Sequence, residues 1–313
     1  RFPPKWFKGY CCFEFAPSEN DSKIDDLSPL FGMHNLKYLN ASNTKVSDLT
    51  PLSNCKNLRE LNIENTKVKS LQPLYGLGSI VKIYADGTSV TSQDVIELKK
   101  IHRQITVIYQ TELLRQWWGN LDDTWRDIFN SHLLCNSNPT PEQLQNIIDI
   151  ESIVIEPTSS VYTLEPLSQM FFLKKLIVNN NLIADLSPLH DKYFLEVLSF
   201  VGNPVDNILP LSNLNSLINL NMENTPVSDL NPLATLNNIQ VLNIGGTFVR
   251  NLKPLAEFDK LEDLSIINTG IKSVIVLENL PSLKYLKAYR TKIKSKSIEL
   301  LKMKNPDLNV VYY

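Results

Sequence analysis

The stretch that decides the fold is LKYLNASNTKVSDLTPLSNCKN (Leu36–Asn57), which is followed without a gap by LRELNIENTKVKSLQPLYGLGS (Leu58–Ser79). The two segments agree at nearly every apolar position, so the sequence repeats with a period of 22 residues. A fixed period of about this length is typical of repeat proteins, in which each short unit buries its apolar side against its neighbours. The shared pattern is L-x-x-L-x-L-x-N-T-x-V-x-D-L-x-P-L-x-x-L-x-x.

Each part of this pattern predicts a local structure. The apolar residues at the first, fourth and sixth positions alternate as in a short strand whose every second side chain points inward. The Asn-Thr pair suits a turn, because its short polar side chains can bond to nearby backbone groups. The L-x-P-L piece is too short for an α-helix and predicts a 3-10 turn on the outer side. Strands that recur in register then predict one parallel sheet along a curved face.

The same pattern returns at six later positions: Leu173, Leu195, Leu217, Ile239, Leu261 and Leu283. These residues resemble leucine-rich repeats of the short type, and they are most similar to those of bacterial internalins and of the leucine-rich regulatory subunit of protein phosphatase 1. The resemblance covers residues 14–110 and 150–313. It implies an α/β solenoid of bacterial type, a right-handed superhelix with a parallel sheet on its concave face and 3-10 or irregular turns on its convex face.

Three residues depart from the repeat pattern. Val276 stands where proline is usual, and Cys55 and Lys192 occupy inward positions that are normally apolar. We interpret Cys55 as a small core residue, which is a common fate of a free cysteine.

Two segments of the chain, Ile80–Gln110 and Leu283–Tyr313, leave the pattern and align with each other without a gap. Each predicts an amphipathic helix followed by a β-branched and aromatic strand. Because a solenoid needs a closing element at its end, each segment is expected to close an array. The sequence therefore predicts a first array over residues 1–110, of about four repeats with a degenerate first one and a closing cap at 80–110. A second array of seven repeats, the first of them 23 residues long, is predicted over 150–313, with its closing cap at 283–313.

Residues 111–149 are predicted to form a helical linker that caps the N-terminal end of the second array. Capping signals divide this segment into three helices. Thr111 and Gly119 are expected to bound the first. A capping box formed by Asn120–Asp123 is expected to open the second helix, and Thr140 is expected to open the third.

The stretch QWWGNLDDTWRDIFN (Gln116–Asn130) holds three of the four tryptophans of the chain, Trp117, Trp118 and Trp125. One interpretation is that Trp118 and Trp125 cover the open end of the solenoid core. The other is that the tryptophans form an aromatic ligand site. The middle helix carries a single apolar stripe opposite its charged residues, which favours the capping role.

Composition excludes several classes of function. The formal net charge of −2 argues against a dedicated nucleic-acid binder, and no apolar run approaches the roughly 20 residues that insert into a membrane. The four histidines are scattered, and no motif for phosphate, dinucleotide or hydrolase chemistry is present. We therefore expect no enzymatic activity, no cofactor and no metal site. We also expect a monomer.

The cysteines and the first residues say little about the compartment. Cys11, Cys12, Cys55 and Cys135 are too few and too scattered for a disulfide framework. The chain opens RFPPKWFKGYCC, with neither Met nor an apolar signal-type segment. We expect a mature product or a piece of a longer protein, whose localisation, cytoplasmic or at the cell surface, stays open.

Charge is distributed unevenly. Residues 111–170 carry nine acidic residues against two arginines, whereas Leu283–Lys304 carries eight basic residues against one glutamate. The basic segment is interpreted either as a solubilising outer face of the closing cap or as a docking patch for an acidic partner.

The candidate binding surface is the outward face of the strands, where the third, fifth and seventh residues of each repeat lie. Apolar and aromatic side chains there favour a partner, although scattered surface Val and Ile need no explanation. The candidate partner-binding residues are Tyr84, Ile177, Val197, Val201, Val241, Ile267, Tyr285, Lys287 and Tyr289.

The sequence favours a non-catalytic module that binds a protein partner through the concave face. Two alternatives remain open. One is a structural or regulatory subunit that positions an enzyme, and the other is a cell-surface adhesin of the internalin type. Nothing in the sequence identifies the partner.

Overall fold

The computed structural model describes residues 14–15, 23–133 and 138–312. The chain divides into two compact units, residues 1–120 with 132–147 and residues 121–131 with 148–313. The predictions made for Cys11, Cys12 and Cys135 lie outside the described residues.

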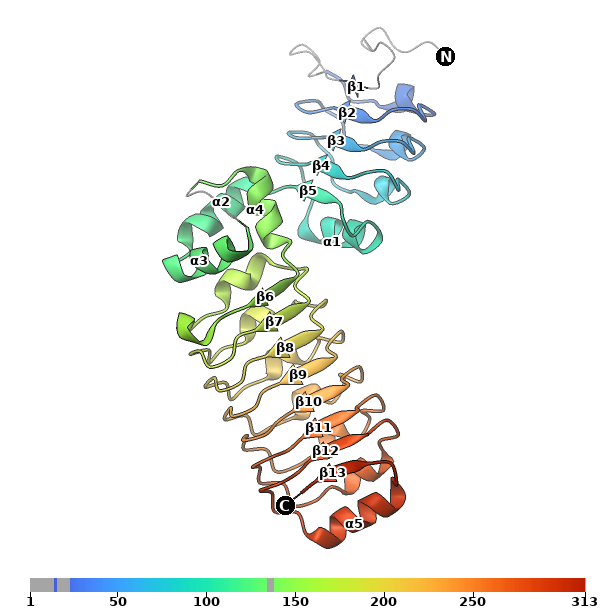
Figure 1. The fold of residues 1–313 in the computed structure, drawn as a ribbon. Helices are drawn as coiled ribbons and strands as arrows, with labels where there is room; N and C mark the ends of the chain where they lie inside the picture. The colour runs from blue at the N-terminus through green and yellow to red at the C-terminus, as the bar shows by residue number, and fades with distance from the viewer. Residues whose placement is uncertain (1–13, 16–22, 134–137, 313) are drawn as a thin grey trace. The chain divides into compact units, whose positions relative to one another are not determined.

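The first unit contains a five-stranded parallel sheet in which neighbouring strands follow the order of the chain (Figure 1). Leu39 pairs with Leu61, one 22-residue repeat further on. The strands are β1 (Glu14–Phe15), β2 (Tyr38–Asn40), β3 (Glu60–Asn62), β4 (Lys82–Tyr84) and β5 (Thr106–Ile108). Three 3-10 helices alternate with them, namely η1 (Ser28–Leu30), η2 (Thr50–Leu52) and η3 (Gln72–Leu74). The predicted alternation of strand and 3-10 turn is confirmed.

The second unit contains an eight-stranded parallel sheet, again in chain order (Figure 1). Ile153 pairs with Leu176, which confirms that the first repeat of this array is 23 residues long. The strands are β6 (Ser152–Val154), β7 (Lys175–Ile177), β8 (Val197–Ser199), β9 (Asn219–Asn221), β10 (Val241–Asn243), β11 (Asp263–Ser265), β12 (Tyr285–Lys287) and β13 (Asn309–Val311). The 3-10 helices are η4 (Pro157–Ser159), η5 (Glu165–Gln169), η6 (Ser187–Leu189), η7 (Leu209–Leu211), η8 (Asn231–Leu233), η9 (Lys253–Leu255) and η10 (Ile275–Asn279).

The turn after each strand depends on one left-handed residue. Asn224 has a φ of 55°, and in the next repeat Gly246 takes the same place with a φ of 68°. Asparagine and glycine are the residues that adopt this conformation most readily. A Cβ atom on Gly246 would also collide with the side-chain amide oxygen of Asn224, so a larger residue there would force the Asn224 side chain to move.

The threonine of the Asn-Thr pair closes the same turn. The Thr66 hydroxyl donates to the Ile63 carbonyl at 2.7 Å, and the Thr225 hydroxyl bonds in the same way to the Met222 carbonyl at 2.7 Å. Where asparagine replaces this threonine, its side chain forms hydrogen bonds to the backbone of the preceding repeat. Asn203 is 1% exposed; its side chain accepts from the Ile183 amide at 2.9 Å and donates to the Val178 carbonyl at 2.7 Å. These bonds satisfy backbone groups that the turns leave buried.

The aspartate that recurs in the pattern starts the 3-10 turn. Asp48 accepts a hydrogen bond from the Thr50 amide at 2.8 Å, and Asp185 accepts one from the Ser187 amide at 2.8 Å. Hydrogen bonds from Thr50 lower the pKa of Asp48. The carboxylate satisfies an amide that has no partner at the start of a helix, which explains why the turn begins two residues later.

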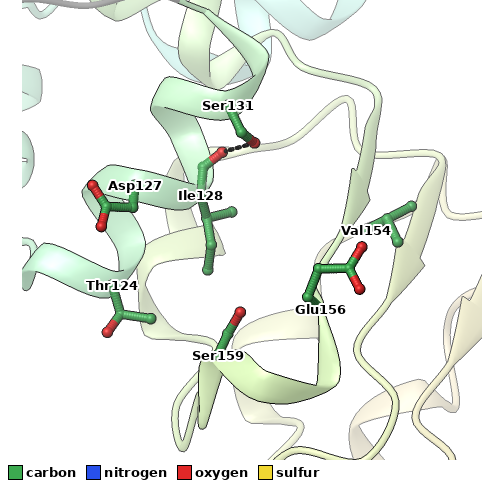
Figure 2. A pocket seen from close by; sticks show the side chains of 7 residues that line it. All are labelled: Thr124, Asp127, Ile128, Ser131, Val154, Glu156 and Ser159. Carbon is green, nitrogen blue, oxygen red and sulfur yellow. Dashed lines mark hydrogen bonds between the residues drawn. The ribbon is translucent and has the colours of Figure 1, made fainter.

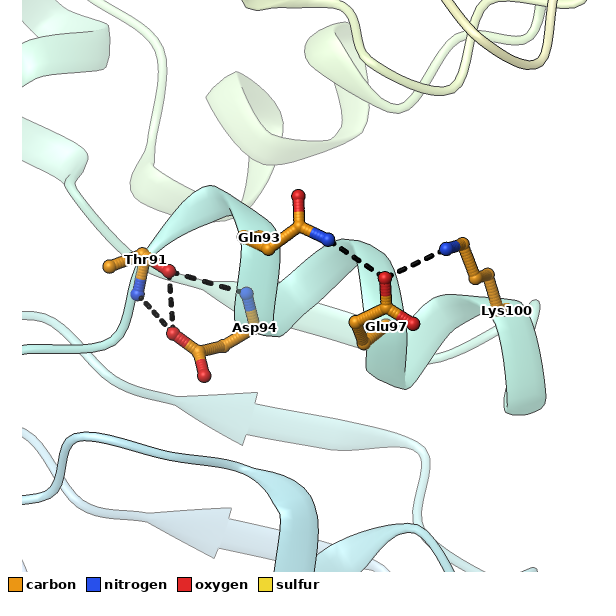
Figure 3. A network of polar contacts seen from close by, with 5 residues as sticks. All are labelled: Thr91, Gln93, Asp94, Glu97 and Lys100. Carbon is orange, nitrogen blue, oxygen red and sulfur yellow. Dashed lines mark hydrogen bonds and ion pairs between the residues drawn. The ribbon is translucent and has the colours of Figure 1, made fainter.

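The closing helices lie where the sequence predicts them, as α1 (Ser92–Ile101) before β5 and α5 (Ser295–Lys304) before β13. A capping box begins α1: the Asp94 amide donates to the Thr91 hydroxyl oxygen at 3.3 Å, and the Thr91 amide donates to the Asp94 carboxylate at 2.9 Å (Figure 3). Further along the helix, Lys100 pairs with Glu97 at 2.7 Å. In α5 no side chain caps the N-terminus, so the two closing caps share their topology but not their polar contacts.

The two unusual inward residues are both buried. Cys55 is 0% exposed and free, and burial raises the pKa of its thiol to about 11, which confirms its interpretation as a core residue. Lys192 is also 0% exposed. Its ammonium donates to the Asp191 carboxylate at 2.5 Å and to the Ser168 carbonyl at 3.1 Å, and it lies 5.1 Å from the ring centroid of Phe171. Burial lowers the pKa of Lys192, and this effect outweighs the opposite influence of Asp191.

Three helices follow β5, as predicted: α2 (Thr111–Asn120), α3 (Asp123–His132) and α4 (Pro141–Ile148). The predicted ends of α2 were wrong. Thr111 is the first residue of this helix, and Asp86 binds both its amide, at 2.8 Å, and its hydroxyl, at 2.5 Å. The helix also continues through Gly119, because a glycine in αR conformation does not end a helix.

The predicted start of α3 was also wrong, whereas that of α4 is confirmed. Asp122, and not an Asn120–Asp123 box, accepts the Trp125 amide at 2.8 Å. At α4 the Thr140 amide donates to Gln143 at 2.9 Å, and the Gln143 amide donates back to the Thr140 hydroxyl at 3.2 Å.

The tryptophans are divided between the two units. Trp118 and Trp125 are 5% and 1% exposed. Trp125 lies in the second unit with its ring 5.5 Å from that of Phe129, whereas Trp118 lies in the first unit, 6.3 Å from the ring of Trp117. The domain boundaries predicted at 110 and 149 stay a prediction. Within that segment, α2 belongs to the first unit and α3 to the second.

Candidate partner-binding face

The strands of the second unit place three rows of side chains on the sheet surface that faces away from the core. The strand register aligns them from repeat to repeat. We call the surface that these rows form the outward sheet face. The rows are Lys175, Val197, Asn219, Val241, Asp263 and Tyr285; Ile177, Ser199, Asn221, Asn243, Ser265 and Lys287; and Asn179, Val201, Glu223, Gly245, Ile267 and Tyr289.

Eight of the nine predicted residues lie on this face, but they do not form one patch. At the C-terminal end, Tyr285 is 51% and Tyr289 37% exposed, and the register sets Tyr289 beside Ile267. Lys287 is exposed between the two tyrosines. We call Ile267, Tyr285, Lys287 and Tyr289 the tyrosine group.

A second apolar group lies nearer the start of the array. Val197 and Val201 are half-buried on and just after β8, and Ile177 lies diagonally to both on β7. Diagonal neighbours in a sheet are close enough for such side chains to touch. Val241 is half-buried and separated from Val197 by Asn219, so the register leaves it outside both groups.

Hydrogen-bonded polar side chains lie both between the two groups and among the valines. Between the groups, the Asn243 amide donates to the Glu223 carboxylate at 2.9 Å. Among the valines, the Asn179 side-chain oxygen accepts from the Ser199 hydroxyl at 2.7 Å and from the Val201 amide at 2.9 Å. These contacts hold polar side chains of the face in place within the chain itself.

Neighbouring groups crowd Gly245 on the outward sheet face. A Cβ atom there would lie 3.2 Å from the Asn243 side-chain oxygen and 3.3 Å from the Ile267 carbonyl. A larger residue at this position would therefore displace its neighbours.

Charges around the tyrosine group are partly paired. Lys287 lies 3.5 Å from the Asp263 carboxylate, and Lys284 lies 2.8 Å from that of Glu262. The side chains of both lysines remain about half exposed, at 49% and 59%. Such surface ion pairs have small interaction free energies, so both ammonium groups stay available to an acidic partner.

Two exposed residues at the ends of this face are not among the predicted ones. Val154 on β6 is 46% exposed and Val311 on β13 is 43% exposed. Both strands were predicted, but only the regular repeats between them were placed in rows. Extending the period-2 alternation into these end strands would have found both residues.

The ninth predicted residue, Tyr84, lies on the first array in a different setting. Lys82, two residues earlier, is 5.2 Å from the Tyr84 ring centroid and 2.8 Å from the Glu142 carboxylate of α4. The hydrogen bond to Glu142 raises the pKa of Lys82. Tyr84 therefore lies beside an intramolecular ion pair.

The described part of the chain offers no group of three His, Cys, Asp or Glu side chains that could hold a metal ion. Among the same residues, no helix is both long and apolar enough to cross a membrane.

Residues 34–76 match the family model described as Leucine Rich repeats (2 copies). No curated protein matches the sequence. Among solved structures, an internalin (InlF) of Listeria monocytogenes is 22% identical, with a TM-score of 0.49, over 93% of this chain and 77% of that one. An internalin C2 of the same species is 24% identical (TM-score 0.48; 61% of this chain, 93% of that one), and a leucine-rich-repeat protein of Leptospira interrogans is 16% identical (TM-score 0.43; 90% and 86%).

Proposed function

We propose that this chain, which is a leucine-rich-repeat protein, is a non-catalytic recognition module that binds a protein partner through the outward sheet face of residues 173–290. This face is the concave one of the predicted superhelix. The observation that carries the proposal is the tyrosine group. Two exposed tyrosines and an isoleucine lie together at one end of a face whose middle is polar.

Tyrosines suit this role for a physical reason. Each buries a large apolar ring on binding, keeps a hydroxyl for a hydrogen bond, and loses few rotamers. Lys287 stands between Tyr285 and Tyr289, so the same contact can also select an acidic group on the partner.

The polar middle of the face supports binding in another way. Its Asn243 and Glu223 side chains already bind each other, so a partner meets a preorganised surface. Ordering of side chains on association is costly, and a surface that is ordered beforehand avoids part of that loss. A regulatory subunit and a cell-surface adhesin both fall within this proposal and differ only in the partner.

The test compares matched tyrosines. A partner captured from native extract by the wild-type chain is measured against Tyr285→Ala and Tyr289→Ala by titration calorimetry. Each variant is expected to weaken binding at least tenfold, since interface tyrosines often contribute about 2 kcal/mol or more. Tyr193→Ala is the control, because Tyr193 is 55% exposed but lies outside the strands. A loss on Tyr193→Ala with unchanged affinity in the other two variants would place the partner elsewhere.

A further inference from the structure

The outward side of the closing strand is covered in the first array and open in the second. Ile108 on β5 is 2% exposed, although the register places it beside Tyr84 on the outward side of the sheet. Its counterpart 203 residues later is Val311 on β13, which is 43% exposed and lies beside Lys287. The same place in the fold is therefore buried in one array and accessible in the other.

Helices α2 and α4 bind the first closing segment on both sides of Ile108. Lys82, at the third position of its repeat, pairs with Glu142 of α4 at 2.8 Å. The Thr111 amide, at the start of α2, donates to Asp86 at the seventh position at 2.8 Å. Both helices belong to the same compact unit as this sheet. Apolar side chains of both helices are at most 5% exposed, namely Leu114, Trp118, Leu144 and Ile147. Amphipathic helices therefore fit at this end of the first sheet.

We propose that the tyrosine group and Val311 receive an α-helix of the protein partner, at the place that α2 and α4 occupy on the first array. This inference rests on the proposed function, because it assigns a structure to the partner of the same face. The helix carries an apolar stripe, which covers Tyr285, Tyr289 and Val311. Acidic residues lie beside that stripe.

The spacing of the two tyrosines suits a helix. Tyr289 follows Tyr285 by four residues, which span about 13 Å in an extended chain. A helix with its side chains is about 10–12 Å across. Lys287 and Val311 lie in the row between the two tyrosines. A helix that lies along this row contacts one tyrosine on each flank and Val311 beneath it.

The charges at this end of the sheet select acidic residues on the partner helix. Leu283–Lys304 carries eight basic residues against one glutamate. The Lys287 side chain is 49% exposed, and its pair with Asp263, at 3.5 Å, is a weak one. In the first array a helix already supplies a carboxylate at the neighbouring position, because Glu142 binds Lys82. A carboxylate beside the stripe of the partner helix can bind Lys287 in the same way.

A strand added to the sheet is the alternative kind of contact. It would pair with the edge of β13 that faces away from β12. Tyr285 and Tyr289 lie one strand further in, so they would flank such a strand on one side only. In the first array the sheet ends at β5, the counterpart of β13, and the chain continues into α2. These observations favour a helix over a strand.

The test finds ligands without a known partner. A phage-displayed library of random peptides, long enough for about four helical turns, is selected on the full chain. Binders that also bind the double variant Tyr285→Ala, Tyr289→Ala are discarded. We expect the retained peptides to carry apolar residues at three- and four-residue spacing with Asp or Glu beside them, and to gain helical circular dichroism on binding. Retained peptides in which apolar and polar residues alternate, or no retained peptide, would overturn the proposal.

A variant outside the tyrosines tests where the helix lies. Val311→Thr keeps the β-branched shape and replaces one methyl group that the helix covers by a hydroxyl. We expect it to weaken the retained helical peptide about threefold in titration calorimetry. Val154→Thr is the matched control and should leave the affinity unchanged, because Val154 is 46% exposed in the same row at the other end of the sheet. Equal affinities of the wild type and Val311→Thr would contradict the placement of the helix over β13.

This experiment uses no partner, so its outcome is separate from that of the captured partner. If Tyr285→Ala weakens the partner but the retained peptides are extended, the binding face is kept and the helical occupant is wrong. If the helical peptides depend on the tyrosines but the affinity of the partner does not, the helix site is kept and the proposed function is wrong.

Discussion

Lys192 offers the sharpest test of how this solenoid is stabilised. Its ammonium is 0% exposed at a repeat position where Leu214, one repeat later, is 0% exposed as well. We predict that Lys192→Met stabilises the second unit, whereas Lys192→Ala destabilises it strongly. The two substitutions differ in whether they keep the apolar stem.

The magnitudes follow from the contacts of the side chain. Both substitutions remove the buried charge and leave the Ser168 carbonyl and the Asp191 carboxylate without their partner; the Asp191 side chain is 24% exposed, so water can solvate it. Alanine also removes three buried methylenes, at about 0.8 kcal/mol each, and leaves a cavity, so Lys192→Ala should be about 5 kcal/mol less stable than Lys192→Met. Methionine keeps nearly all of the volume, and relief of the desolvation of the buried ammonium is expected to contribute about 2 kcal/mol. After about 1 kcal/mol for the lost Ser168 bond, a net gain of about 1 kcal/mol remains.

Thermal unfolding followed by far-UV circular dichroism measures both effects. For a unit of this size, 1 kcal/mol shifts the Tm by about 2–4 °C, so Lys192→Met should raise the Tm by about 3 °C and Lys192→Ala should lower it by about 12 °C. Leu214→Met is the matched control for methionine at this position and should cost less than about 1.5 kcal/mol. A Tm of Lys192→Met below that of Leu214→Met would refute the reasoning, because it would mean that the ammonium contributes more than its burial costs.

The same comparison has a pH dependence of known sign. Burial lowers the pKa of Lys192 in the folded chain, so between this lowered pKa and the ordinary value of about 10.4 the unfolded chain binds more protons than the folded one. The free energy of unfolding of the wild type then rises with pH relative to Lys192→Met. The advantage of methionine should therefore shrink from pH 7 towards pH 10. An advantage that grows over this range would contradict the lowered pKa.

Three further predictions concern the repeat itself. Asn203→Ala should cost about 3 kcal/mol in urea unfolding, since it leaves buried backbone groups in two repeats without partners, whereas Asn213→Ala at an exposed position should stay within about 0.5 kcal/mol. Gly246→Ala should destabilise by about 2 kcal/mol, because of its φ of 68° and the collision with the neighbouring asparagine, and Gly78→Ala, with open space around it, should not. In a chain whose other cysteines are replaced by serine, Cys55 should not react with a thiol reagent at pH 8 until the chain unfolds; prompt reaction would contradict its pKa of about 11 and its burial.

Much of the fold could be predicted because every repeat carries the same pattern of apolar and turn residues. Leu39 and Leu61 occupy the same position in successive repeats, and the structure pairs them directly. The one-residue shift before the second array was likewise visible in the spacing of the apolar residues around Ile153. Residues one repeat apart in the sequence pair with each other in neighbouring strands, and this strand register determines which side chains face outward.

Contacts between different kinds of element could not be predicted in this way. Asp86 caps α2 from 25 residues earlier in the chain, and no local capping rule finds such a partner. The partners of Lys192 were equally hidden, since Ser168 lies 24 residues away on another turn. A hollow is lined by Ile128 and Ser131 of α3 and by Glu156 and Ser159 after β6, and only the packing of the two segments brings these residues together (Figure 2).

The two closing segments of the chain, Ile80–Gln110 and Leu283–Tyr313, can be compared with each other. Corresponding residues are 203 positions apart, so Lys82 and Asp86 of the first array correspond to Tyr285 and Tyr289 of the second. In the first array these two outward positions attach the helices that follow, Lys82 by pairing with Glu142 of α4 and Asp86 by capping α2.

In the second array the corresponding tyrosines are 51% and 37% exposed. These two outward positions therefore make contacts within the chain in the first closing segment, and they present large aromatic rings to solvent in the second. Charged residues suit the first role, because their partners lie in the same unit and pair with them as the chain folds. Tyrosines suit a contact that forms and breaks with a separate molecule, because their rings remain compatible with water when the partner is absent. The difference between the two copies therefore favours the tyrosine group as the place where a partner of the second array binds.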